Sequence, residues 1–113
     1  MAREQLQNLT EPMYYILLSL STEPKHGYEI MQTISEITYG AVNVGAGTLY
    51  ALLTRFEKED IIKHVSLPNN DPRRKTYTLT TKGRGELHQE YERLKKSAAA
   101  YDKYAVKGVA PND

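Results

Sequence analysis

The sequence predicts a mainly α-helical fold of the α+β class, in which three short helices precede a two-stranded hairpin and one long helix closes the chain. Two observations support this prediction. Apolar residues recur with helical spacing in three segments of the first half and again after residue 80. Between them, residues 61–79 alternate apolar and polar side chains on both sides of a turn. With 113 residues, the chain is long enough for one compact domain and too short for two.

The first helix is predicted to begin at residues 10–12, because a threonine, a glutamate and a proline all suit a first helical turn. The apolar residues that follow recur at i, i+3, i+4 and i+7, and they are Met13, Ile16, Leu17 and Leu20. Tyr14, Tyr15 and Leu18 form a second apolar face. This helix is therefore expected to be covered on two sides, by its own core and by something else.

A turn at residues 23–27 precedes the second helix, whose helical periodicity runs from Tyr28 to about Thr38. The glycine-rich residues 39–47 indicate a turn, and a third helix follows at about residues 46–60. Its inner face is apolar and consists of Leu49, Leu52, Leu53 and Phe56. At about 100° per residue, the outward face is small, hydroxylic or basic, and consists of Gly47, Ala51, Thr54, Arg55 and Lys58, with Thr48 and Tyr50 on its flanks.

Residues 61–67 and 76–79 are predicted to form the two strands of a hairpin, joined by the turn residues 68–72. The returning strand follows three consecutive basic residues, Arg73, Arg74 and Lys75.

Charge is uneven along the chain, although the net charge is only +1. Residues 1–62 carry four basic and eight acidic side chains, whereas residues 63–85 carry six basic and one acidic, a local net charge of +5. Positive charge in so short a segment suits a local contact with phosphate, and a solvated basic loop is the alternative.

A long polar helix is predicted from Thr80 or Thr81, either of which can cap it, to about Val106. Its apolar residues are separated by intervals of four and three, and they are Leu87, Tyr91, Leu94, Ala98, Tyr101 and Ala105. This heptad spacing favours pairing with a second helix. Gly83 and Gly85 are expected to loosen the first turn.

Three helices followed by a basic hairpin is the element order of a winged helix-turn-helix, with the hairpin as the wing. In that fold the third helix enters the major groove of DNA and the wing reaches the adjacent backbone. The small and hydroxylic outward face of the third helix would allow close approach to base edges, while an ordinary amphipathic surface helix is the alternative.

Three segments carry a resemblance to a known family: residues 25–30 (KHGYEI), 47–62 (GTLYALLTRFEKEDII) and 73–83 (RRKTYTLTTKG). In this order and spacing, the sequence resembles the PadR-type transcriptional regulators over roughly residues 10–95. The resemblance implies a DNA-binding winged helix-turn-helix at residues 10–80, a C-terminal dimerisation helix at residues 81–107, and flexible ends at residues 1–9 and 108–113.

The expected partner is double-stranded operator DNA, bound by a homodimer with half-sites about one helical turn apart. The third helix would read the major groove, the wing would hold phosphate or the minor groove, and the start of the second helix would contact the backbone. The expected DNA-binding residues are Lys25, His26, Tyr28, Gly47, Thr48, Tyr50, Ala51, Thr54, Arg55, Arg73, Arg74 and Lys75.

The short C-terminal tail resembles the smaller PadR subfamily, which includes repressors of multidrug efflux genes. In that group, a flat aromatic drug can lie between the protomers. The corresponding dimer interface and effector pocket would be formed by Tyr14, Tyr15, Leu18, Leu87, Tyr91, Leu94, Ala98 and Tyr101. Efflux regulators that capture planar drugs well have a tryptophan where this chain has Leu94, and the chain contains no Trp. A ligand pocket and a plain dimer core both remain open.

The sequence argues against an enzyme, a metal and a cofactor. There is no cysteine, and His26, His64 and His88 are scattered without metal-ligand spacing, so each is expected to be solvated or to cap a helix. Gly45 and Gly47 lack the rest of a dinucleotide-binding fingerprint. No apolar stretch is long enough to span a membrane and residues 1–10 lack a signal-peptide core, so a cytoplasmic protein is expected.

The predicted function is therefore a homodimeric repressor of a transporter or stress-response gene, relieved by a small aromatic effector or another signal. Two alternatives share its fold. One is a winged-helix regulator of the MarR or ArsR type, although MarR chains add a longer helical frame at both ends. The other is a winged-helix protein-interaction module that does not touch DNA, which the basic residues 73–75 argue against.

Overall fold

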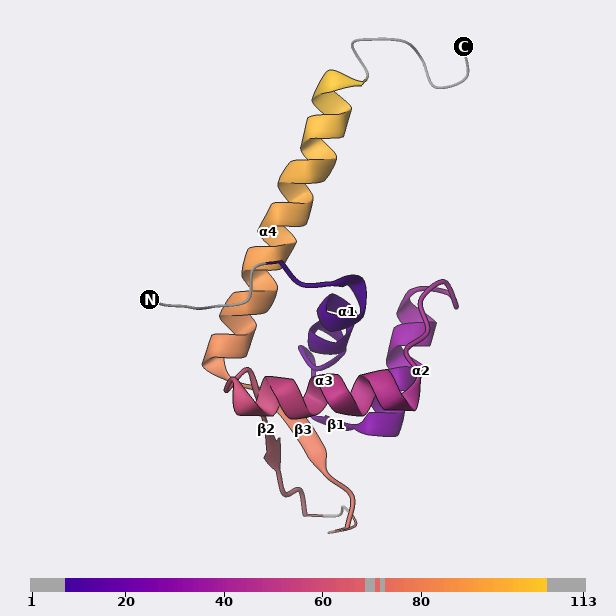
Figure 1. Ribbon diagram of the computed structural model, residues 1–113, viewed down its shortest axis with the longest axis vertical. Helices are drawn as coiled ribbons and strands as arrows, with labels where there is room; N and C mark the ends of the chain where they lie inside the picture. The colour runs from indigo at the N-terminus through magenta and orange to yellow at the C-terminus, as the bar shows by residue number, and fades with distance from the viewer. Residues whose placement is uncertain (1–7, 69–70, 72, 106–113) are drawn as a thin grey trace.

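The computed structural model describes residues 8–68, 71 and 73–105 of the chain (Figure 1). It confirms the predicted fold class, four helices with a small antiparallel sheet. In chain order the elements are α1 (Glu11–Ser19), β1 (Lys25–His26), α2 (Gly27–Ile37), α3 (Ala46–Lys58), β2 (Ile62–Val65), β3 (Thr76–Leu79) and α4 (Thr81–Tyr104).

The sheet has three strands in the order β1-β3-β2, with both pairs antiparallel. The short strand β1 was expected to be part of a turn. Lys25 pairs with Tyr77 and His26 with Thr76, so the start of α2 is attached to the base of the wing. Strand β2 ends at Val65, two residues earlier than predicted, and Leu67 beyond it is exposed.

One hydrophobic core lies between α1, α2, α3 and the sheet. The stripe predicted for the first helix is buried throughout, as are Ile30 and Ile34 of α2. Leu49, Leu53 and Phe56 of α3 are buried, whereas Leu52 is only half-buried. Full burial of an aliphatic or aromatic side chain contributes roughly 1.5–3 kcal/mol, so this core is the main source of the domain's stability.

The start of α4 is fixed to the turn between α3 and β2. Thr80 caps the helix, since its hydroxyl accepts a hydrogen bond from the Gly83 amide at 2.9 Å. The same hydroxyl lies 2.7 Å from the Asp60 carbonyl oxygen and 3.0 Å from that of Ile61. A Cβ at position 83 would clash with the Ile61 carbonyl oxygen, so Gly83 permits close packing here and does not merely loosen the turn.

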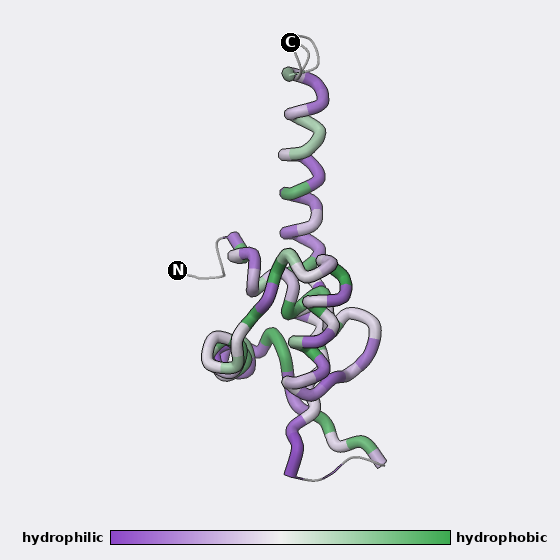
Figure 2. The backbone as a smooth tube through the Cα atoms, turned by 90° about the vertical axis from the view of Figure 1, so that its right-hand side faces the viewer, coloured by the Kyte–Doolittle hydropathy of each residue, from purple (hydrophilic) through white to green (hydrophobic). Residues whose placement is uncertain are grey.

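Beyond its first turns, α4 rises clear of the rest of the domain (Figures 1 and 2). All residues from Arg93 to Tyr104 are exposed, including the apolar side chains among them. No helix in the described part of the chain is long and apolar enough to cross a membrane.

Of the two expected flexible ends, residues 1–7 and 108–113 lie outside the described residues. Leu9, which was assigned to the N-terminal end, is instead buried in the core. Its amide donates a hydrogen bond to Glu90 Oε1 of α4 at 3.4 Å, so the packed domain includes this residue.

Candidate nucleic-acid interface

An open groove of about 970 Å³ lies between the start of α2, the flank of α3 and the wing. We call it the interface groove. Seven of the twelve residues predicted to bind DNA line it, namely His26, Tyr28, Tyr50, Thr54, Arg73, Arg74 and Lys75. Segments that are more than 40 residues apart in the sequence therefore contribute to one concave surface.

The remaining predicted residues of α3 lie along its solvent-facing side. Gly47, Thr48, Ala51 and Arg55 are exposed, as the angular spacing predicted. Gly45 caps the helix without a side-chain hydrogen bond, so the first-turn amides remain open to an anion. The Arg55 guanidinium pairs with Glu59 at 3.1 Å on the same exposed face.

Lys25 was predicted to contact the DNA backbone, and its position in the structure argues against this. Its side chain is buried, and its ammonium donates to the Ser19 carbonyl oxygen at 2.7 Å and to the Thr22 hydroxyl at 3.4 Å. Successive residues of a strand face opposite sides, so β1 turns Lys25 inward and His26 toward the groove. The lysine therefore caps the C-terminal end of α1, where a cation is favourable.

His26 is the cap of α2, one of the two roles expected for the histidines. Its Nδ1 lies 3.4 Å from the Glu29 amide, and its backbone amide donates to Glu29 Oε1 at 3.0 Å. Its Nε2 lies 3.1 Å from Arg74 Nη1 of the wing. Tyr28, the next predicted residue, is 61% exposed and open to a partner.

Tyr50 connects α3 to the first turn of α2. A Cβ at position 27 would clash with the Tyr50 hydroxyl, so only glycine lets this ring lie against α2. About half of the tyrosine surface remains exposed, in the wall of the interface groove.

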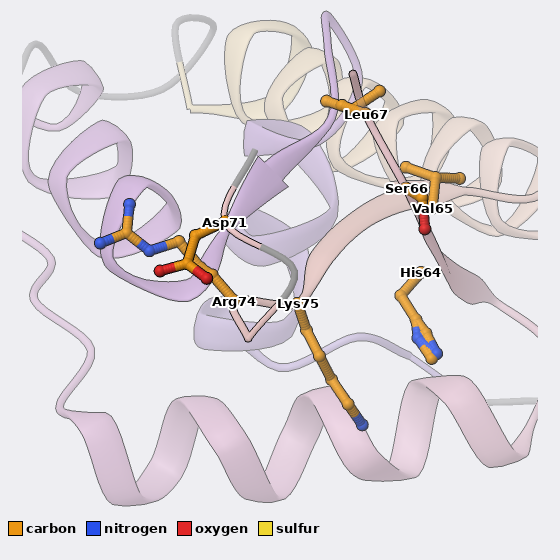
Figure 3. Close-up of a pocket in the computed structure, with 7 residues that line it drawn as sticks. All are labelled: His64, Val65, Ser66, Leu67, Asp71, Arg74 and Lys75. Carbon is orange, nitrogen blue, oxygen red and sulfur yellow. The ribbon is translucent and has the colours of Figure 1, made fainter. Parts of the chain in front are cut away.

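The cationic residues of the wing differ in their partners. Asp71 binds the Arg73 guanidinium through two hydrogen bonds of 3.2 and 3.0 Å and accepts a third from the Arg73 amide at 2.9 Å. These bonds hold the pKa of Asp71 below its usual value. No hydrogen bond or ion pair from the described residues engages the Lys75 ammonium, and its side chain extends toward α3 (Figure 3).

A smaller pocket of about 350 Å³ opens between the two strands of the wing, with His64 on one side and Arg74 and Lys75 on the other (Figure 3). The His64 ring stacks on Tyr77 at 6.4 Å and its Nδ1 lies 3.6 Å from Glu57 Oε2. Burial raises the pKa of Tyr77 above its usual value. Sequence reasoning missed both Tyr77 and Asp71 as members of the site, although each is close to the basic residues in the chain.

The predicted dimer and effector residues fall into two groups. Those near the domain are half-buried, and they are Tyr14, Tyr15, Leu18 and Leu87. Tyr14 and Tyr15 meet edge to face at 5.4 Å. Those farther along α4 are exposed, and we call them the α4 seam: Tyr91, Leu94, Ala98 and Tyr101.

A buried carboxylate that was not predicted, Glu90, lies where the segment before α1 meets α4. Glu90 is 5% exposed. Its carboxylate accepts a hydrogen bond from the Leu9 amide and forms an ion pair with Arg93 at 2.5 Å. The Arg93 guanidinium is the main reason that the pKa of Glu90 is below its usual value. Burial is the main reason that the pKa of the adjacent Tyr14 is raised.

Within the described residues, no three histidine or acidic side chains are grouped so that they could hold a metal ion. The interface groove is lined by basic, hydroxyl and aromatic groups together with Glu29 and Asp71, and its donors can bind anions and hydrogen-bond acceptors.

Residues 16–89 match the model of the transcriptional regulator PadR-like family. Among solved structures, the chain is similar to a PadR-like transcriptional regulator from Bacillus cereus, with 26% identity, a TM-score of 0.70, and coverage of 85% of this chain and 91% of that one. It is also similar to a PadR-like transcription factor from Bacteroides fragilis, with 33% identity, a TM-score of 0.64, and coverage of 80% and 85%.

A third similar structure is that of Bacillus subtilis PadR in complex with operator DNA. The identity is 27% and the TM-score 0.59, over 67% of this chain and 44% of that one.

Proposed function

Because this chain belongs to the PadR-like family of transcriptional regulators, we propose that it binds double-stranded operator DNA through the interface groove and the exposed face of α3. This is a family of regulators and not of enzymes. The observation that carries the proposal is that the cationic wing, the start of α2 and the flank of α3 border a single open groove. The binding of operator DNA by the related Bacillus subtilis protein supports it.

In the proposed complex, α3 lies in the major groove with Ala51 and Thr54 toward the base edges. A small side chain such as Ala51 permits close approach, and the hydroxyl of Thr54 can hydrogen-bond to bases or phosphates. Lys75 and Arg73 contact the backbone beside it, and Arg74 reaches the adjacent minor groove, whose width depends on sequence. The exposed Tyr28 approaches the DNA backbone at the start of α2.

The active species in this proposal is a homodimer joined along α4. The α4 seam presents apolar side chains at heptad spacing on a helix that stands clear of its own domain. A second copy would bury this seam and place two reading helices on one duplex. Residues 10–80 would then serve as the DNA-binding domain and residues 81–107 as the dimerisation helix.

We further propose that the dimer represses its target, because a protein bound across an operator blocks polymerase from overlapping promoter DNA. The target would be a transporter or stress-response gene, as in the efflux regulators that the sequence resembles. The half-buried Tyr14 and Tyr15 beside Tyr91 would line either a planar aromatic effector pocket or a plain dimer core. Fluorescence titration with a planar aromatic compound separates the two, since a plain core would show no saturable binding.

The DNA-binding proposal is tested by measuring the affinity for a 30-bp duplex as a function of salt. Replacing Arg73 and Lys75 with alanine should weaken binding and lower the salt slope by up to about 0.9 log units per lost phosphate contact. The matched control removes the same charge from α4, through Lys96→Ala and Lys103→Ala, and should keep the slope. A wild-type protein without salt-dependent duplex binding would instead support a protein-interaction module.

A further inference from the structure

His26 connects the start of α2 to the wing. Its side chain is 14% exposed, so the ring is nearly enclosed between the two elements. Pairing of His26 with Thr76 places the ring at the base of the wing, next to the Arg74 guanidinium.

The two ring nitrogens of His26 face two hydrogen-bond donors. Nδ1 faces the Glu29 amide at 3.4 Å and Nε2 faces Arg74 Nη1 at 3.1 Å. A neutral imidazole has one accepting nitrogen, and an arginine side chain stays protonated. The ring can therefore accept from the amide or from the arginine but not from both. The contact with Arg74 is the shorter, and the start of α2 keeps its bond from the His26 amide to Glu29 in either case.

The charged groups around the ring determine what a proton would do. Glu29 of α2 has an oxygen 3.4 Å from Nε2, while the wing contributes Arg74 together with Asp71, Arg73 and Lys75 in the same groove. Protonation turns Nε2 into a donor, which repels the Arg74 guanidinium and is attracted to Glu29. Only the neutral ring can hold the arginine.

From this geometry we propose that His26 is a positioning residue for DNA binding. The neutral ring holds the Arg74 guanidinium at the edge of the interface groove through its Nε2. This proposal rests on the proposed function, because holding Arg74 affects the affinity of the protein for DNA. An arginine that is already held in one conformation loses less side-chain freedom when it meets its contact on DNA. A duplex that offers this contact therefore gains affinity over one that does not.

The hydrogen bond itself can be tested in the free protein, without DNA. Nitrogen-15 NMR at pH 8 reports which ring nitrogen of His26 carries the proton. We expect the proton on Nδ1 in the wild type, and its transfer to Nε2 in Arg74→Ala, where the ring is free to accept from the Glu29 amide. The same tautomer in both proteins would overturn the proposal.

The effect on DNA is tested with His26→Asn, because asparagine suits the cap position of α2 but has no distal ring nitrogen to reach Arg74. An unchanged thermal midpoint verifies the fold. Two affinities are measured: one for a duplex that the wild-type protein enriched from a random library, and one for an unselected duplex. The quantity compared is the ratio of the first affinity to the second. We expect this ratio to be about two- to tenfold lower in His26→Asn than in the wild type, the size expected for ordering one long side chain.

Adding Arg74→Ala to His26→Asn should change the ratio no further. His88→Gln, on α4, is the control and should keep the wild-type ratio. A wild-type ratio in His26→Asn, or fully additive losses in the double variant, would refute the positioning role. Failure of the wild type to enrich any duplex would refute the proposed function instead, while the NMR result would still decide the His26–Arg74 bond.

Discussion

The buried carboxylate of Glu90 joins the segment before α1 to α4. It accepts a hydrogen bond from the amide of Leu9, which precedes α1, and forms an ion pair with Arg93 on its own helix. Hydrogen bonds to a charged group typically contribute about 1.5–3 kcal/mol, and a buried partner left unpaired costs a similar amount. This residue should therefore matter more to stability than any of the exposed ion pairs along α4.

The first prediction is that Glu90→Gln lowers the free energy of unfolding at pH 7 by about 1–3 kcal/mol. The folded-state pKa of Glu90 lies below its unfolded value, so its contribution is present above the unfolded value and is lost as the pH falls through the folded one. Urea denaturation at several pH values should show the two proteins converging in acid. Glu92→Gln, whose partners are exposed, is the control and should change stability by less than about 1 kcal/mol.

For single residues, the sequence predicted which positions are exposed better than it predicted their hydrogen-bond partners. The outward positions of α3 follow from angular spacing alone, and the structure exposes them. The inward direction of the Lys25 side chain could not be predicted, because it depends on pairing with Tyr77, some 50 residues away. The bonds of Asp71 to Arg73 and of His26 to Arg74 depend on the folded path of the wing, which local spacing does not encode.

At the scale of elements, the packing of α4 against the turn after α3 depends on a missing side chain. A Cβ at Gly83 would meet the backbone of Ile61, which cannot rotate away, whereas a Cβ at Gly85 would have nothing within 4 Å. The two glycines lie in the same first turns of one helix, so they form a matched pair.

The second prediction is that Gly83→Ala lowers the free energy of unfolding by about 1–3 kcal/mol, the usual cost of overpacking. Gly85→Ala should be neutral or should stabilise by up to about 1 kcal/mol, because alanine is the better helix former. Thermal unfolding of both variants measures the difference. Equal midpoints would show that α4 begins farther from Ile61 than the structure indicates.

The third prediction concerns the exposed face of α3. Ala51→Glu would place a negative charge against the phosphates and close to the base edges, so operator binding should fall by at least about 100-fold, given about 1.4 kcal/mol per tenfold. The core residues of α3 are untouched, so the thermal midpoint should not change. The control is Ala99→Glu, which adds the same charge on α4 outside the seam. Normal operator binding by Ala51→Glu would mean that another surface reads the DNA.

Helical elements were predictable because each carries its own apolar period and, for α1 and α4, its own threonine cap. Strand β1 was not, since two residues are too few to show alternation and its existence depends on β3. The end of β2 was overestimated because Leu67 continues the alternation after pairing has stopped at Val65.

In the molecule as a whole, the outer part of α4 leaves its apolar side chains exposed. A helix that stands clear of its domain gains nothing from tertiary packing, and isolated helices of about 12–15 residues are marginal in water. The heptad spacing predicted a partner helix because it describes one apolar face of α4, whereas the identity of the partner depends on residues of another helix. Whether the seam also encloses an effector likewise depends on the space between two copies.

The fourth prediction is that Leu94→Asp shifts the protein toward monomer and removes cooperative operator binding. In a two-fold dimer the introduced charge would be desolvated against its own copy, which costs several kcal/mol. Sedimentation velocity measures the assembly, and Ala99→Asp is the control outside the α4 seam. A fully dimeric Leu94→Asp protein would show that the seam does not form the interface.

In the proposed complex, two copies of this chain, joined along α4, place two α3 helices on one face of operator DNA. Hydroxyl-radical footprinting of the wild-type protein on a duplex enriched from a random library tests this arrangement. We expect two protected patches whose centres lie about one helical turn apart, or about 10–10.5 base pairs. A single protected patch, or no protection on any enriched duplex, would rule the arrangement out.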